Sequence, residues 1–403
     1  MSRQEKSWVR IVLVLVSLGT GSCASTNIPA LVESTTPDTQ SLQLYEDEEH
    51  LWEVASRLEE KIESNDLLYR NQQLDAYLQA VSERILLRAT DRPGISARIR
   101  VLRNPGTNAF VLPNGAIYIS TGMLVLIENE AQLATVIGHE LTHYLYRHSL
   151  KQTRSAENKQ KWSAVFGVLV AGAGGDSLGG EVASLWAAAS LSGYSRELET
   201  EADSKGLSLT IQAGYDPEEA PKVFENLLAA SDEREDDLSY FFASHPRLRD
   251  RILNYRSLID NRYSQLASSR DLVKKSVEYL DSIDPLILDN VAMDIEYRQW
   301  SNAESTINRF LERHPDSARA YFLKGEISRK TPDAEQGYDI ALSQYHKAME
   351  LEGTPAETYK SAGLIYRAQG DHARAGEVFR RYLSESPDAI DAPIISSYLI
   401  DTE

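Results

Sequence analysis

Apolar side chains follow a helical period over residues 45–90. Leu74, Leu78, Val81 and Ile85 are three or four positions apart, which is the spacing of a helix that buries one face. We therefore expect this region to be largely helical. Residues 26–41, which precede it, are rich in Thr, Ser and Pro and have no period. That composition is typical of a tether.

The period changes shortly before residue 100. The segment ARIRVLR alternates polar and apolar residues, and AFVLPNGAIYIS places Asn114-Gly115 between two β-prone runs. Asn-Gly between alternating hydrophobics is a strong hairpin signal, so we expect a small antiparallel sheet. An apolar-periodic helix, AQLATVIGHELTHYLY, follows. Its expected start is Asn129, with Gln132 three residues on as a capping-box partner.

The most apolar internal stretch, residues 162–195, has a glycine-rich centre from Gly172 to Gly180. Each half is shorter than the ~20 residues that cross a bilayer. The glycines also lack the spacing and the following lysine of a phosphate-binding loop. We expect a buried or site-covering helical hairpin here, and neither a membrane anchor nor a nucleotide site.

The C-terminal third repeats its pattern. The last unit is marked by Tyr359, Gly363, Tyr366, Gly370, Ala375, Phe379 and Pro387. Earlier units are marked by Tyr321, Gly325, Ala341, Tyr345 and Ala348, and by Ala303, Ile307, Phe310 and Pro315. These are the spacings of tetratricopeptide repeats, so we expect a short solenoid from about Ser282 onward, with a generic helical bundle as the alternative. Such arrays present a concave face to peptides or partner proteins.

Composition narrows the classes of partner. The chain has 403 residues, 42% of them hydrophobic, and a formal net charge of −18. The length predicts two or three domains with a sizeable core. The acidic balance argues against an electrostatic grip on nucleic acid or anionic lipid, so no nucleic-acid partner is expected.

One segment is membrane-directed, and it is the N-terminus. Arg3, Lys6 and Arg10 precede a short apolar run over residues 11–18, and small residues follow it. This order is typical of a secretory signal peptide.

The single cysteine, Cys23, follows the apolar run. TGSC resembles a lipoprotein box, with Thr20 where leucine is usual, and would make Cys23 a lipidation site. Cleavage after Ala24 would instead discard the cysteine, and Cys23 would then be an incidental small residue. In every case no internal disulfide can form.

The segment VIGHELTHYLYRH holds three of the eight histidines. On a helix, His139 and His143 lie one turn apart on one side, so both imidazoles can reach one tetrahedral zinc ion. Glu140 projects to the flank, where a carboxylate can contact metal-bound water, and H-E-x-x-H is a metalloprotease pattern for this reason. His148 falls on the side opposite His139, so we expect it to face solvent.

A third ligand is available in SRELETEADSKG. Glu199, Asp203 and Gly206 share one face of the expected helix, and Ala202 allows another helix to approach closely. A catalytic zinc ion takes three protein ligands and keeps one position open for water. An aspartate one turn on could accept a hydrogen bond from a ligand histidine. Taken alone, the same stretch would be a solvated acidic face.

Together, GHELTHYLYRHS and SRELETEAD, about sixty residues later, resemble the M48 family of zinc metallopeptidases. This branch of the gluzincins has the pattern H-E-x-x-H plus E-x-x-A-D. The resemblance implies that His139, His143 and Glu199 ligate one zinc ion per chain. It also implies that Glu140 is the general base and that Asp203 supports a ligand histidine.

Two further segments extend the resemblance. NAFVLPNGAIYISTGML is similar to the family's hairpin, and SHPRLRDRI to its later His-Pro motif. By that likeness His245 and Arg251 would line the site. His245 would bind the oxyanion, fill the fourth zinc position in a latent state, or serve as a structural cap. Arg251 would stabilise the oxyanion or pair with an acid.

The whole arrangement is similar to bacterial periplasmic M48 proteases linked to outer-membrane protein assembly and quality control. It implies a zinc endopeptidase that cleaves extended or misfolded proteins, with a protein partner on the repeats. Membrane contact would come only through a lipid on Cys23. One alternative is a mostly latent protease that acts as a chaperone or assembly-binding module. Another is a structural zinc site, which only His245 could complete.

The expected fold is mainly α, with a gluzincin-type protease domain followed by an α-solenoid. The expected organisation is a signal peptide over residues 1–23, a linker over 24–44, the metallopeptidase domain over 45–275, and tetratricopeptide-like repeats over 282–403. In this arrangement the small antiparallel sheet lies beside the HExxH helix.

Overall fold

The computed structural model describes residues 46–89, 95–154, 193–232, 245, 247–267, 272–332 and 334–400. The expected signal peptide, the linker and Cys23 lie outside these residues, as does most of the apolar stretch with the glycine-rich centre. No helix within the described ranges is long and apolar enough to cross a membrane.

Three strands form a small mixed sheet in the order β1-β3-β2. They are β1 (Arg98–Leu102), β2 (Ala109–Val111) and β3 (Ala116–Ser120). β2 and β3 make the expected antiparallel hairpin, and Gly115 in its turn has a φ of 84°. β1 joins β3 in parallel, so the sheet is mixed rather than wholly antiparallel. This pairing skips over β2, and the alternation within β1 contains no information about its direction.

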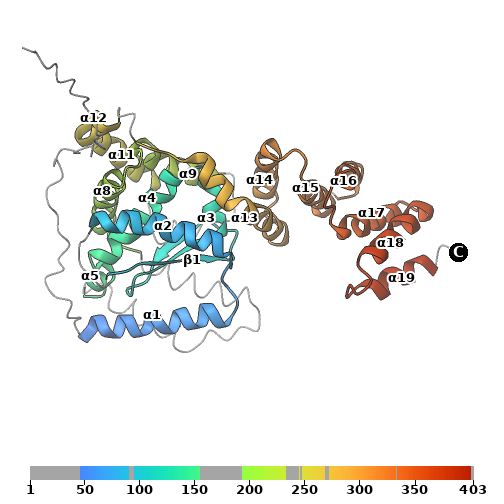
Figure 1. Cartoon of the computed structure of the whole chain (residues 1–403), viewed down its shortest axis with the longest axis horizontal. Helices are drawn as coiled ribbons and strands as arrows, with labels where there is room; N and C mark the ends of the chain where they lie inside the picture. The colour runs from blue at the N-terminus through green and yellow to red at the C-terminus, as the bar shows by residue number, and fades with distance from the viewer. Residues whose placement is uncertain are drawn as a thin grey trace, which may run out of the picture. The chain divides into compact units, whose positions relative to one another are not determined.

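Helices cover both faces of this sheet (Figure 1). Successive residues of a strand point to opposite faces. Tyr118 therefore packs with α1 (Glu46–Ser64), while its neighbours Ile117 and Ile119 enter the main core with α2 (Gln72–Ala89). The apolar positions predicted for the buried face of this helix are all in that core, namely Leu74, Leu78, Val81 and Ile85.

The helix with the HExxH motif is α4 (Glu130–Leu145), which follows the short α3 (Thr121–Leu126). Its N-cap is Asn129, as predicted, and the Asn129 side chain accepts a hydrogen bond of 2.9 Å from the Gln132 amide. The reciprocal bond differs from a capping box. The Gln132 side chain accepts from the amide of Glu128, one residue earlier, at 3.0 Å.

The long helix α8 (Arg196–Gln212) packs directly against α4. Gly138 and Gly206 face each other where the two helices meet. A Cβ on Gly206 would lie 3.0 Å from backbone atoms of Gly138 and His139. Since backbone atoms cannot move aside as side-chain tips can, the two helices need glycine at this crossing.

The remaining elements complete the shell around α4 and α8. They are α5 (His148–Arg154), η1 (Pro217–Glu219), α9 (Ala220–Asp232), α11 (Leu248–Leu258), η2 (Ile259–Tyr263) and α12 (Ser264–Ala267). Helix α11 contacts both α8 and α9. It therefore places the residues of α11, among them Arg251, beside α8.

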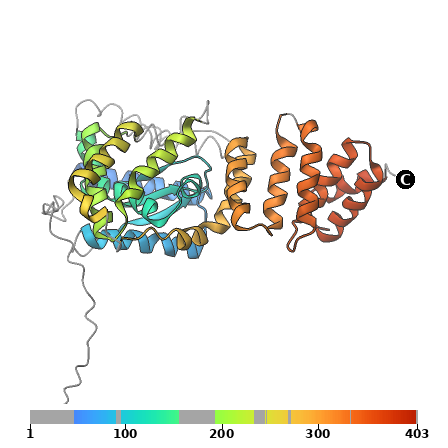
Figure 2. The same cartoon turned by 90° about the horizontal axis from the view of Figure 1, so that it is seen from above.

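The C-terminal region consists of helices in antiparallel succession, as Figure 2 shows. They are α13 (Ser276–Glu296), α14 (Trp300–Arg313), α15 (Ala318–Lys330), α16 (Ala334–Met349), α17 (Ala356–Ala368), α18 (His372–Glu385) and α19 (Ala392–Ile400). Two helix pairs, α15 with α16 and α17 with α18, pack through the same kind of contact. The ring of Tyr345 lies against Gly325, and the ring of Phe379 lies against Gly363. These are predicted repeat positions, and the helical solenoid is confirmed.

The hydrophobic core continues from the sheet region into the first repeat helices. Tyr279, Ile283 and Ile307 belong to the same cluster as Leu133 and Ile137 of α4. A separate cluster forms around α16 to α18. The boundary expected near residues 275–282 stays a prediction, since apolar packing is continuous across it.

The first turn of α4 holds a buried carboxylate, Glu130. It accepts hydrogen bonds from the hydroxyls of Tyr77 and Tyr215, each at 2.7 Å, and from Arg84 at 2.9 Å. Lys275, the residue before α13, donates to it at 2.8 Å. A negative charge at a helix N-terminus is favourable. Glu130 therefore ties α2, α4 and the start of α13 together.

A second buried carboxylate, Glu219, lies beside the same helix end. The side chains of Asn129 and Gln132 donate to it at 2.9 Å each, Lys222 at 2.7 Å and Lys274 at 2.6 Å. Burial opposes ionisation, but the two lysines and the two amides lower the pKa of Glu219 from 4.5 to about 2. The charged form is therefore the one that the fold stabilises.

Replacing Gly206 tests the helix crossing. We expect Gly206→Leu to lower the free energy of unfolding by about 2 kcal/mol or more, because the side chain would meet backbone and force α4 and α8 apart. Chemical denaturation of the full chain measures the change. Ser204→Ala, on the same helix, is the control and should change stability by less than about 0.5 kcal/mol. Equal stability of both variants would contradict the close approach.

Glu219→Gln tests the carboxylate by pH. Because the folded pKa is lowered, Glu219 stabilises the fold above pH 4.5, and this contribution disappears as pH falls from about 4.5 toward 2. We expect the variant to be about 1–2 kcal/mol less stable at pH 7, a value discounted for the partly exposed lysines. The difference should shrink toward zero in denaturant titrations at successively lower pH. A difference independent of pH would rule out this charge effect.

Candidate functional site

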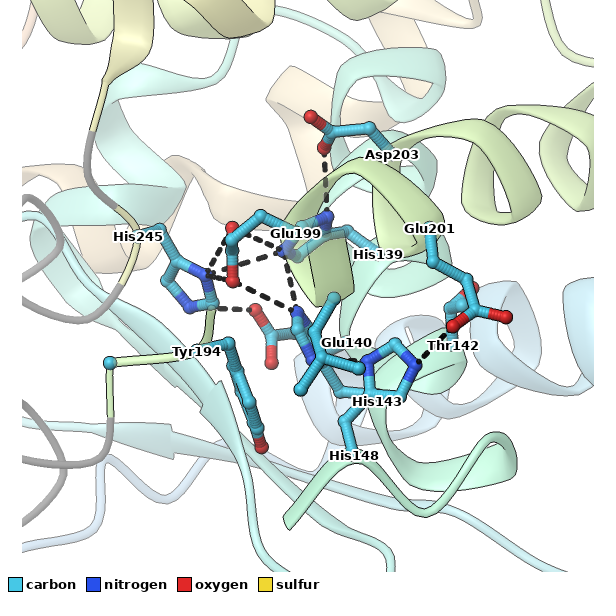
Figure 3. Close-up of polar contacts among 12 residues, drawn as sticks. His139, Glu140, Thr142, His143, His148, Tyr194, Glu199, Glu201, Asp203 and His245 are labelled. Atoms are coloured by element: carbon cyan, nitrogen blue, oxygen red, sulfur yellow. Dashed lines mark hydrogen bonds and ion pairs between the residues drawn. The ribbon is translucent and has the colours of Figure 1, made fainter. Parts of the chain in front are cut away.

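Two histidines of α4 face one point in the interior. His139 and His143 are 2% and 1% exposed, and their Nε2 atoms are 3.0 Å apart. The four-residue spacing on one helix produces this convergence (Figure 3). Each ring therefore has one nitrogen turned to a shared point and one turned away from it.

Helix α8 places a carboxylate at the same point. Glu199 is buried, with Oε2 3.6 Å from His139 Nε2 and Oε1 3.4 Å from His143 Nε2. On α4 the crossing lies at Gly138, the residue directly before His139, and on α8 it lies at Gly206, about two turns after Glu199.

His245 supplies a fourth donor from a segment remote in sequence. Its Nδ1 lies 3.3 Å from His139 Nε2 and 3.0 Å from Glu199 Oε1. One ligand atom from each of the four residues lies within 4.8 Å of the others, and all four residues are buried. The Nε2 of His245 lies 3.5 Å from Oε1 of Glu140.

The donor set fits a divalent metal ion. Three imidazole nitrogens and a carboxylate converge in a water-poor interior, which is the ligand chemistry of zinc and related ions. Both carboxylate oxygens of Glu140 are buried and accept no hydrogen bond. A buried carboxylate without donors is costly unless something else occupies its surroundings.

The outer nitrogen of His139 is held by a charged network. Its Nδ1 lies 3.0 Å from Oδ1 of Asp203, and Tyr255 donates to that oxygen at 2.9 Å. Arg251 pairs with Asp203 at 2.5 Å and stacks over the ring of Phe224 at 4.2 Å. The structure thus places Asp203 and Arg251 directly behind one ring of the donor set.

Charge and burial shift the titration of these groups. Burial lowers the pKa of His139 to about 3 and raises the pKa of Glu140. Burial opposes ionisation of Glu199, but His245 and His143 lower its pKa well below the usual value. Burial likewise opposes protonation of His245, yet the carboxylates of Glu199 and Glu140 raise its pKa.

The expectation that His148 faces solvent is wrong. Helix α4 ends at Leu145, and Arg147 has a φ of 54°, which turns the chain before α5 begins. His148 is therefore not on the α4 helical wheel, and its exposed fraction is 0%. Its Nδ1 lies 2.9 Å from Nδ1 of His143. Burial lowers the pKa of His148 to about 2.

Sequence reasoning also missed Tyr194. Its ring stacks on the ring of His143 with centroids 3.8 Å apart and an interplanar angle of 17°. Its hydroxyl is 3.0 Å from the hydroxyl of Ser149. The available signal was a tyrosine immediately before the helix cap Ser195, five residues before Glu199.

Comparisons with known proteins agree with this geometry. Residues 72–259 match the model of peptidase family M48, and residues 333–390 match a tetratricopeptide repeat model. The mitochondrial metalloendopeptidase OMA1 of Arabidopsis thaliana is 33% identical over 169 residues, 41% of this chain and 33% of that protein. Its counterpart in Schizosaccharomyces pombe is 33% identical over 177 residues, 44% of this chain and 50% of that protein.

The beta-barrel assembly-enhancing protease of Escherichia coli K12 is similar over a longer region. It is 22% identical over 322 residues, 72% of this chain and 64% of that protein. The chain thus spans less than two thirds of each of these relatives. Residues 72–259 are therefore similar to peptidase family M48, and a match to tetratricopeptide repeats follows them along the chain.

Proposed function

We propose that this chain is a zinc-dependent endopeptidase that hydrolyses peptide bonds in extended or misfolded proteins. The main support is the buried donor set of His139, His143 and Glu199 beside Glu140, whose oxygens accept no hydrogen bond. A pure binding module has no use for a carboxylate in that position. The similarity to family M48 and to named metalloendopeptidases supports the same reaction.

Zinc, when bound here, would supply a Lewis acid that lowers the pKa of a water molecule to about 7. Glu140 would accept a proton from that water and return it to the leaving amine. Burial raises the pKa of Glu140, toward the range in which a carboxylate can both take and give a proton. Glu199, with its lowered pKa, stays ionised as a ligand.

Asp203 and Arg251 would act through His139. The Asp203 carboxylate lies 3.0 Å from Nδ1 and would accept its proton, which leaves Nε2 free as a ligand. Nη2 of Arg251 also lies 3.0 Å from that Nδ1, and in this assignment it donates to Asp203 instead. Arg251 is paired with Asp203 at 2.5 Å and is 3% exposed. We therefore assign Arg251 to the support of Asp203 rather than to the oxyanion.

A latent resting state is the second candidate, and the position of His245 favours it. A catalytic zinc site keeps one position open, whereas four protein donors make a closed set. With Nδ1 of His245 among the donors and its Nε2 beside Glu140, the imidazole lies where a substrate or water would need to be. Cleavage would then require His245 to move away. A mostly latent protease could serve as a chaperone or assembly-binding module through its repeats.

The strand β2 and the repeats bear on the substrates and partners. In the described sheet β2 is an edge strand, and an extended peptide can add to such an edge through main-chain hydrogen bonds. This supports unfolded or extended segments as substrates. The tetratricopeptide match supports a protein partner on the solenoid.

We place the protein in the bacterial envelope, in outer-membrane protein quality control. The support is the N-terminal signal pattern together with the similarity to a beta-barrel assembly-enhancing protease. Lipidation of Cys23 would attach it to the outer membrane, whereas cleavage after Ala24 would release it to the periplasm.

Glu140→Gln tests the reaction. We expect one zinc ion per chain in both forms of residues 25–403, and a loss of casein cleavage of about 10²–10⁴-fold in the variant, because the proton acceptor is gone. A chelator should abolish cleavage by the native form. Glu197→Gln, an exposed carboxylate on α8, is the matched control and should cleave normally. Absence of zinc from the native form would refute the proposal.

His245→Ala tests latency. If His245 closes the site, its removal should raise casein cleavage about 10-fold or more, since one position on the metal becomes open. Zinc content measured by elemental analysis should stay at one per chain. A fall in cleavage with zinc retained would instead assign His245 to the reaction itself.

A further inference from the structure

The two helix-borne histidines of the donor set are supported in different ways. Behind His139 stands a buried carboxylate, Asp203, in direct contact. Behind His143 stands another imidazole, His148, and behind that a second carboxylate. The Nε2 of His148 lies 3.3 Å from Oε2 of Glu201, which is on α8 (Figure 3). This second chain of contacts is not used by the mechanism above.

The proton positions in this chain follow from its geometry. A contact of 2.9 Å between two Nδ1 atoms needs one donor and one acceptor. Since His143 turns Nε2 toward the donor set, its proton belongs on Nδ1, which donates. His148 then accepts at Nδ1 and carries its own proton on Nε2. That proton points to the Glu201 carboxylate.

We propose that His148, oriented by Glu201, is a positioning residue that holds His143 in the tautomer able to bind metal through Nε2. The inference rests on the metal site proposed above. His148 is not one of the four converging donors, and it acts on them through its contact with the ring of His143. The outer partner of a ligand histidine commonly fixes its tautomer and orientation in this way.

Three features of the chain serve this arrangement. The left-handed residue Arg147 turns the backbone so that His148 comes back under α4. The ring of Tyr194 stacks on the opposite side of His143 at 3.8 Å, so the imidazole is held both by its face and by its outer nitrogen. Lys151, one turn along α5, lies 3.7 Å from the same oxygen of Glu201 and holds that carboxylate near His148.

The two supports differ in exposure, which separates them experimentally. The Asp203 side chain is 1% exposed, whereas that of Glu201 is 32% exposed. A buried carboxylate acts at full strength, but a partly solvated one is screened. We therefore expect loss of the His148 acceptor to lower zinc affinity more than loss of the Glu201 charge.

The test compares His148→Asn with His148→Leu in the full chain. Asparagine places an acceptor oxygen near the position of Nδ1, whereas leucine fills the space without an acceptor. We expect zinc affinity, measured by competition with a chromophoric chelator, to fall about 10–100-fold in His148→Leu. It should stay within about 3-fold of native in His148→Asn. Glu201→Gln should weaken binding by about 3–10-fold, and Glu197→Gln should have no effect.

Thermal unfolding of the metal-free proteins separates positioning from folding. Both His148 variants should unfold within a few degrees of each other, so a difference in zinc affinity would come from the acceptor alone. If both variants lose affinity equally, or neither does, the positioning role is wrong. If the native chain binds no zinc, the proposed metal site itself fails, which is a different result from either of these.

Discussion

The contact between two glycines sets the geometry on which the site depends. Gly138 and Gly206 let α4 and α8 meet backbone to backbone. At that separation short carboxylate side chains on α8 can reach imidazoles on α4, and both Glu199 and Asp203 do so. A wider crossing would move both carboxylates away from these imidazoles. The position of these side chains therefore depends on the absence of a Cβ atom at Gly138 and Gly206.

The convergence of His139, His143 and Glu199 could be predicted because these residues lie in two short helical segments. Within a helix, spacing alone puts His139 with His143 and Glu199 with Asp203. The helices of the tetratricopeptide repeats were predictable for the same reason, since each repeat packs mainly against its neighbours. Two features could not be predicted, because one depends on a single backbone angle and the other on the pairing of strands that are not consecutive in sequence. His148 was misplaced because one left-handed residue, Arg147, ends the helical wheel. The parallel direction of β1 comes from a pairing that skips a strand.

The buried carboxylates explain why Arg251 and His245 are buried beside them. Two carboxylates, Glu199 and Asp203, share one interior with Glu140, and ionised acids are costly to bury without partners. The guanidinium of Arg251 is the counter-charge for Asp203, and the imidazole of His245 lies between Glu199 and Glu140. Both come from the segment around α11, more than forty residues after α8 begins. Sequence pattern identified the residues through family likeness, but only the folded chain supplies the charge balance.

The two lysines that precede α13 join the first repeat helix to the fold around α4. Lys275 binds Glu130 in the first turn of the HExxH helix, and Lys274 binds Glu219 of η1 beside that helix end. The core continues through α13. A chain cut just before these lysines would keep both acids in the interior and lose a cation from each. The tetratricopeptide region is therefore not an interchangeable accessory. If another domain replaced it, the lysine pair would have to be kept, because otherwise the helix with His139 and His143 would lose two of its charge partners.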